Sequence, residues 1–178
     1  IARIPVEVVI GSEFRYSDPI LCDRTVVLAI SQSGETADTL AAMEQARRQG
    51  APVWSIVNAI GSQAMRVSDG FISMQTGPEI GVASTKAFPA PLVDQYMLAI
   101  LLADLRGTID EKTRRALVSD LRLIPDLVSR TLDRESDVEV VARVLRDVRD
   151  TLYLGRGINM PIAYEGALKL KEISYIHA

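Results

Sequence analysis

Apolar runs alternate with polar turns and helical periods along the first hundred residues, which is the pattern of an α/β fold. Runs of mainly apolar residues predict strands over residues 6–10, 26–30, 52–57 and 71–74. The run at 26–30 is unbroken, which is typical of a strand covered on both faces of a parallel sheet. Helical spacing predicts helices over residues 35–49 and 62–67 and a long apolar helix that ends at Leu105. Gly50 and Gly107 are the expected stop signals. We therefore expect a mostly parallel sheet flanked by helices.

The second part of the chain has a different pattern. From Ile109 to about Val148 the sequence is helical and rich in charge, with breaks at Pro125 and around residues 133–137. A new strand that ends in glycines is predicted over Leu152–Gly157, and a helix should run from about Ile162 to the end of the chain. The predicted organisation is an α/β domain over 1–107, a helical connector over 108–150 and the opening of a second α/β unit over 151–178.

Composition narrows the function classes. The formal net charge of the 178 residues is −3 and only 5% are aromatic, which argues against a nucleic-acid partner. The single Cys22 excludes an internal disulfide and fits a reducing cytoplasm. The most apolar window, residues 96–102, lies between Asp94 and Asp104 and is too short to cross a bilayer, so no membrane association is expected.

The turn Ser31–Thr36 carries the first candidate chemistry. It directly follows an apolar strand and opens a helix, whose N-terminus offers unpaired N–H groups and positive potential. Ser31, Gln32, Ser33 and Thr36 add polar donors, and the run lacks both the Gly-Lys-Ser/Thr of a nucleotide loop and the glycines of a dinucleotide fingerprint. A single phosphate monoester is the expected ligand. The alternative is an ordinary helix cap.

The predicted terminal helix carries a second candidate site. Glu165, Lys169 and Glu172 fall on one face at 3.6 residues per turn. A carboxylate facing a pocket can act as a general base while an ammonium stabilises developing negative charge. The alternative is a surface salt-bridge ladder, which Glu165 and Lys169 would form at a favourable spacing.

Five segments together resemble a known family. They are residues 12–16, 31–40, 79–88, 154–157 and 165–178. In this order they resemble the isomerase half of the glutamine–fructose-6-phosphate aminotransferases, which is built of two sugar-isomerase (SIS) domains. The resemblance implies a flavodoxin-like SIS sandwich, with the connector similar only in character.

The resemblance implies a role for individual residues. Ser31, Gln32, Ser33 and Thr36 would hold the 6-phosphate of fructose 6-phosphate or glucosamine 6-phosphate, and Val82 and Ser84 would line the sugar. Glu172 would move a proton between C1 and C2, assisted by Lys169. The family implies no metal and no organic cofactor.

The resemblance also implies parts outside this chain. They are a first strand before Ile1, a glutaminase domain upstream, and a ring-opening histidine after Ala178 that comes from the other subunit of a homodimer. The chain alone should therefore be inactive in the full reaction. His177 does not match the ring-opening position, and we expect it to have a packing role.

Two further functions share the same sugar site. A SIS-type glucosamine-6-phosphate deaminase would lack the glutaminase domain. A non-catalytic SIS sugar-phosphate sensor would keep the phosphate turn but would not need Glu172 and Lys169.

Overall fold

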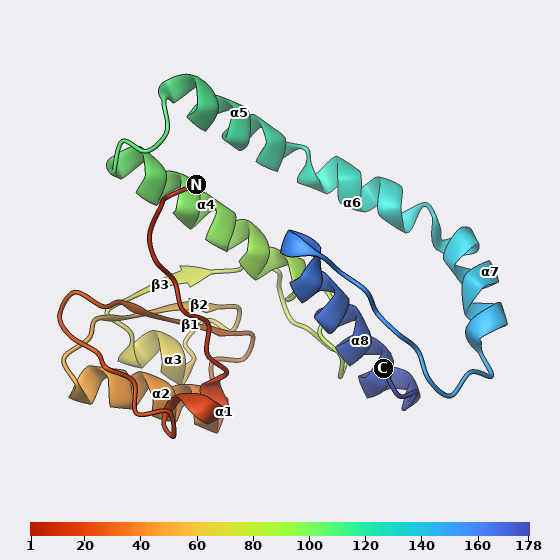
Figure 1. Cartoon of the computed structure of the whole chain (residues 1–178), viewed down its shortest axis with the longest axis horizontal. Coiled ribbons are helices and arrows are strands. Elements are labelled where there is room, and N and C mark those ends of the chain that lie inside the picture. Colours follow the sequence, from red (N-terminus) through yellow and green to blue (C-terminus); the bar gives the residue numbers. More distant parts are fainter. The chain divides into compact units, whose positions relative to one another are not determined.

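The computed structural model describes all 178 residues, and its elements are drawn in Figure 1. Contacts divide the chain into two compact units. The first comprises Ile1–Ile80 and Thr85–Leu117, and the second comprises Gly81–Ser84 and Val118–Ala178. The first unit contains the sheet, and the regular elements of the second are all helices.

The sheet of the first unit has three parallel strands in the order β1-β2-β3. The strands are β1 (Val27–Ser31), β2 (Val53–Val57) and β3 (Gly70–Ser73). Ser31 pairs with Val57, which in turn pairs with Ser73, so all three strands end at the same edge of the sheet. Ligands of open α/β sheets bind at such an edge.

Helices bury both faces of the central strand. Residues alternate between the faces of a strand. Val53 and Val57 pack with Leu40, Met43 and Ala46 of α2 (Ala37–Arg48) and with Ala64 of α3 (Gln63–Val67). Ile56 packs instead with Met74 and Ala87, and α4 (Pro89–Leu105) also contacts β2. This two-sided burial explains why β2 is apolar except at Ser55, which is itself buried.

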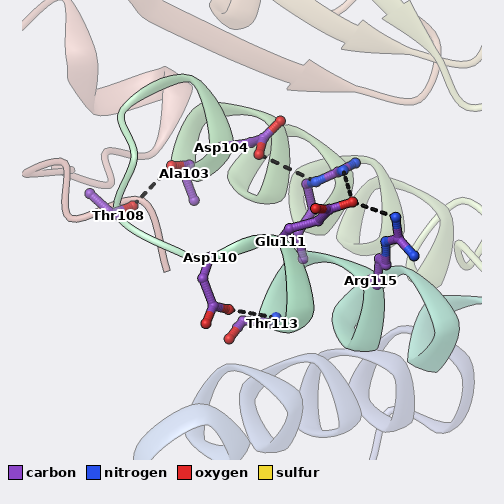
Figure 2. Close-up of polar contacts among 8 residues, drawn as sticks. Ala103, Asp104, Thr108, Asp110, Glu111, Thr113 and Arg115 are labelled. Carbon is purple, nitrogen blue, oxygen red and sulfur yellow. Dashed lines mark hydrogen bonds and ion pairs between the residues drawn. The ribbon is translucent and has the colours of Figure 1, made fainter.

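A polar corner connects α4 to α5 (Glu111–Arg122), as Figure 2 shows. Arg114 Nε lies 3.3 Å from Asp104 Oδ1 of α4. The N–H of Thr113 donates to Asp110 Oδ1 at 2.7 Å, and the hydrogen bonds from Thr113 lower the pKa of Asp110. The first turn of α5 is therefore capped by a carboxylate.

The second unit consists mainly of α6 (Ile124–Leu132), α7 (Glu135–Leu145), a short 3-10 helix (Gly157–Asn159) and α8 (Met160–Ser174). No residue from 118 to 178 is buried. Large apolar side chains such as Leu127 and Val141 are more than half exposed. No helix of either unit combines the length and apolar character that crossing a membrane requires.

The structure confirms most of the expected elements. The predicted strands at 26–30, 52–57 and 71–74 and the helices at 35–49 and 62–67 are present within two residues of their predicted bounds. The breaks in the helical connector fall at Leu123 and at 133–134, and Pro125 lies in the first turn of α6.

Two predicted strands are wrong. Residues 6–10 form no strand and precede α1 (Gly11–Phe14), and Val6 and Val8 are largely exposed. Residues 152–157 also pair with no strand, and the Tyr153 ring lies against Gly166 of α8 instead. An apolar run becomes a strand only when a neighbour supplies hydrogen-bond partners.

The terminal helix is shorter than predicted. It ends at Ser174, where Tyr175 adopts a left-handed conformation with φ 60°. The chain then returns to make an isolated parallel bridge between Asp150 and His177.

Candidate functional site

The turn that follows β1 is built by its own serine hydroxyls. The N–H of Gly34 donates to Ser31 Oγ at 3.0 Å, and the N–H of Glu35 donates to Ser33 Oγ at 3.2 Å. Both hydroxyls are used as acceptors, so each keeps its own proton to donate. Thr36 occupies the N-cap position of α2 but makes no side-chain capping bond. Its hydroxyl is therefore not committed to the ordinary helix cap that was the alternative to an anion site.

Gly34 brings the turn into contact with a second loop. Its φ is 64°, a left-handed conformation that favours glycine, and a Cβ here would lie 2.3 Å from Ser62 Oγ. Ser62 precedes α3 and is buried, and its hydroxyl has no hydrogen-bond partner. A glycine is therefore needed at position 34 for two reasons: the left-handed backbone conformation and the lack of room for a side chain beside Ser62.

The segment Asn58–Ser62 between β2 and α3, here called the β2–α3 loop, holds the turn in place. The carbonyl of Gln32 accepts the N–H groups of Asn58 and Ala59, each at 3.1 Å. The carbonyl of Gly34 accepts the N–H of Ala64 at 3.0 Å. The backbone of the turn is therefore fixed from behind by hydrogen bonds that need no ligand.

The β2–α3 loop was not among the predicted site residues. A signal for it exists in the sequence, because Asn58 follows β2 at the edge where the Ser31–Thr36 turn follows β1. Asn58 also reaches the end of β3: its Nδ2 donates to the carbonyl of Gly77 at 2.7 Å, and its Oδ1 accepts the Thr76 hydroxyl at 2.9 Å. One buried amide thus connects the segments that follow two strands.

The loop that carries Val82 and Ser84 is closed at its base. Glu79 Oε1 accepts the N–H and the hydroxyl of Thr85 at 2.8 and 2.6 Å. Within the closed loop, Ala83 is buried while the Val82 side chain is fully exposed. Residues 81–84 belong to the second unit.

The second candidate site lies on α8. Lys169 Nζ is 3.3 Å from Glu165 Oε1 and 2.7 Å from Glu172 Oε2, so the predicted common face, here called the charged face, is confirmed. The hydrogen bond to Glu172 is the main cause that raises the pKa of Lys169, with Glu165 adding to it. The ammonium therefore stays charged at neutral pH and can donate hydrogen bonds.

His177 does not have the packing role expected for it. Its side chain is 84% exposed, and Nδ1 lies 3.2 Å from Asp150 Oδ1. Its backbone holds the chain end, because its carbonyl accepts the N–H of Thr151 at 2.8 Å. No cluster of three or more His, Cys, Asp or Glu side chains is arranged to hold a metal ion.

The site residues thus form separate groups. Ser31, Gln32, Ser33 and Thr36 lie in one turn of the first unit. Val82 and Ser84 lie in the closed loop, and Lys169 and Glu172 lie on α8, both in the second unit. The structure brings Lys169 and Glu172 together with Glu165, a residue predicted for that face.

Comparison with known sequences identifies a family. The model of the SIS domain matches residues 1–101. The chain is 49% identical over 177 residues to the glutamine–fructose-6-phosphate aminotransferase (isomerizing) of Corynebacterium diphtheriae, with 99% of this chain and 28% of the relative covered. The enzyme of the same name from Thermus thermophilus is 47% identical over 178 residues, with 100% of this chain and 30% of the relative covered. The chain thus spans under a third of the length of these relatives.

Comparison with solved structures gives the same family. The C-terminal domain of glucosamine-fructose-6-phosphate aminotransferase from Francisella tularensis superposes with a TM-score of 0.96 at 40% identity, over 99% of this chain and 50% of that one. These findings confirm the resemblance inferred from the five segments. They also confirm the predicted fold class, a parallel sheet flanked by helices.

Proposed function

The chain belongs to the SIS-domain family, and from this premise we propose that it is the sugar-phosphate isomerase portion of a glutamine–fructose-6-phosphate aminotransferase. The observation that carries the proposal is the near-50% identity to enzymes of that name over 99% of the chain. That match includes both the Ser31–Thr36 turn and the charged face of α8.

In this proposal the Ser31–Thr36 turn binds the 6-phosphate of fructose 6-phosphate. The hydroxyl protons of Ser31 and Ser33 are free to donate because the oxygens already accept backbone N–H groups. Gln32 and Thr36 add an amide and a hydroxyl at the N-terminus of α2, whose dipole favours an anion. Val82 and Ser84 line the sugar.

The charged face of α8 performs the proton transfer. Glu172 removes the C1 proton of the ketose imine and returns it at C2, which yields the aldose amine. Lys169, whose raised pKa keeps it an ammonium, stabilises negative charge that develops on the sugar oxygens. Its hydrogen bond to Glu172 also holds the carboxylate in one orientation.

The proposal is tested on the full-length protein with glutamine and fructose 6-phosphate in D₂O. We expect glucosamine 6-phosphate carrying deuterium at C2, because the proton held by a carboxylate exchanges with solvent. Mass spectrometry and NMR identify the product and measure the deuterium at C2. Product formation without glutamine dependence would contradict the aminotransferase assignment.

The same assay separates the two other functions. A deaminase would convert glucosamine 6-phosphate to fructose 6-phosphate and ammonia and would ignore glutamine. A sensor would bind fructose 6-phosphate without turnover.

We further propose a homodimer joined to an upstream glutaminase domain. Sedimentation and the full-length gene test these two points.

A further inference from the structure

We propose that Glu35 is a positioning residue that orients the hydroxyl of Ser33 toward the bound phosphate by anchoring the turn to the start of α3. This inference rests on the proposed function, since it assigns the support of the same phosphate site. Glu35 itself touches no substrate in this account. It acts through the turn.

The first observation is a side-chain bond between two segments distant in sequence. Glu35 Oε1 accepts the N–H of Gln63 at 2.7 Å. Gln63 begins α3, and Ser62, the residue before it, makes no side-chain capping bond. A carboxylate from the Ser31–Thr36 turn therefore satisfies an N–H that a helix start leaves unpaired, and such a bond to an ionised acceptor is stronger than a neutral one.

The second observation is that Glu35 is held at its backbone as well. Its N–H donates to Ser33 Oγ at 3.2 Å, so the position of Glu35 decides where the Ser33 oxygen finds a donor. With that lone pair occupied, the hydroxyl proton of Ser33 must point away from Glu35. Glu35 thus bonds to the start of α3 through its side chain and to Ser33 Oγ through its backbone, so the position of α3 influences how the Ser33 hydroxyl is oriented.

The third observation concerns charge. Glu35 is adjacent to Thr36 and two residues from Ser33, so its carboxylate would repel a phosphate dianion bound there, since like charges disfavour each other. The bond to Gln63 pairs the Glu35 carboxylate with a backbone donor of α3. Geometry and charge therefore predict different KM values for Glu35→Gln. Geometry predicts an unchanged KM, because an oxygen acceptor for the Gln63 N–H is kept. Charge repulsion predicts a lower KM, because the negative charge is removed.

The experiment uses the full-length enzyme and steady-state kinetics with fructose 6-phosphate. Loss of one charge-assisted hydrogen bond corresponds to a roughly tenfold loss of affinity. We therefore expect Glu35→Ala to raise KM about tenfold, with kcat within about twofold of the wild type. Inorganic phosphate, used as a competitive inhibitor, should lose affinity by the same factor. Glu35→Gln should restore KM to within about twofold of the wild type. Glu44→Ala, which removes an exposed carboxylate from α2, is the matched control.

Each outcome decides the inference. If Glu35→Ala does not fold, Glu35→Asp takes its place, because the shorter side chain keeps the charge but should not reach Gln63. An active wild type with an unchanged KM in the Ala or Asp variant overturns the role of Glu35 and leaves the proposed function standing. A fall in kcat and thermal stability without a change in KM also overturns it. A wild type that binds neither fructose 6-phosphate nor inorganic phosphate overturns both.

Discussion

The Ser31–Thr36 turn and the charged face of α8 are two polar sites with very different support. Behind the turn lies a sheet whose central strand is fully buried at Val53, Ile56 and Val57. The turn itself is fixed by backbone bonds from the β2–α3 loop. Behind the charged face there is no buried residue anywhere from 118 to 178. Its side chains are held mainly by ion pairs with one another.

Because of this difference in support, the two sites should control different properties of the protein. In the turn, the groups proposed to bind phosphate also form the fold, because Ser31 and Ser33 accept the N–H groups that shape it. On α8, the charged groups contribute little to folding, since ion pairs that remain partly exposed to solvent are weak. Substitutions in the turn should therefore change binding and stability together. Substitutions on the charged face of α8 should change turnover with little effect on stability.

The largest expected effect tests the α8 half of this comparison. Glu172→Gln in the full-length protein should lower kcat by about 10²–10⁴-fold, the contribution of a general base, while the Kd for fructose 6-phosphate changes little. Rapid-quench kinetics and calorimetric titration measure the two quantities. Lys171→Gln, which removes a neighbouring charge from the same helix, is the control. Substantial turnover in Glu172→Gln would remove that residue from the mechanism.

The next effect tests whether the turn is part of the fold. Gly34→Ala should lower the free energy of unfolding by about 3 kcal/mol, from left-handed strain and the clash with Ser62. Gly50→Ala has a similar φ of 83° but nothing within 4 Å, so it should cost only about 1 kcal/mol. Urea denaturation measures both. Equal losses would show that the packing against Ser62 contributes nothing.

A third prediction concerns binding at the turn. Ser33→Ala combined with Thr36→Ala should weaken fructose 6-phosphate binding by about tenfold to a hundredfold, because two donors to a charged group are lost. Titration calorimetry gives the Kd, and Glu172→Gln, which keeps the turn intact, serves as the reference. An unchanged Kd would refute the assignment of the phosphate site.

The smallest effect is expected for the salt bridge on α8. Glu165→Gln should lower the free energy of unfolding by less than about 0.5 kcal/mol. Because the folded pKa of Lys169 is raised, this contribution is fully present below about pH 10 and is lost as the pH rises through the raised value. Thermal melts at neutral and alkaline pH test it. A loss that persists unchanged at high pH would mean that Glu165 stabilises α8 by packing.

Much of the first unit could be predicted from local patterns. The strand at β2 was predicted from the mainly apolar run at 52–57, and α2 was predicted because Ala37, Leu40 and Met43 recur at helical spacing. The runs at 6–10 and 152–157 were also predicted to be strands from their apolar residues, but they form none. Whether such a run pairs depends on the neighbours that the rest of the chain brings to it.

The candidate site shows the same division. The charged face of α8 follows from helical geometry alone, so the contacts of Lys169 with Glu165 and Glu172 could be predicted. The bonds from Asn58 to the end of β3 and from Gln63 to Glu35 could not, because they join segments that meet only when the strands pair.

Local sequence patterns were sufficient to predict the buried strands, the hydroxyl-rich turn after β1 and the three charges on one face of α8. Each of these is a periodic or adjacent pattern, and the chain geometry fixes it locally. The tertiary structure was needed to show that the turn is hydrogen-bonded to the β2–α3 loop and that the runs at 6–10 and 152–157 do not pair as strands. The physical reason is that a backbone hydrogen bond between distant segments requires a partner at a definite position, which parallel pairing provides and local pattern does not.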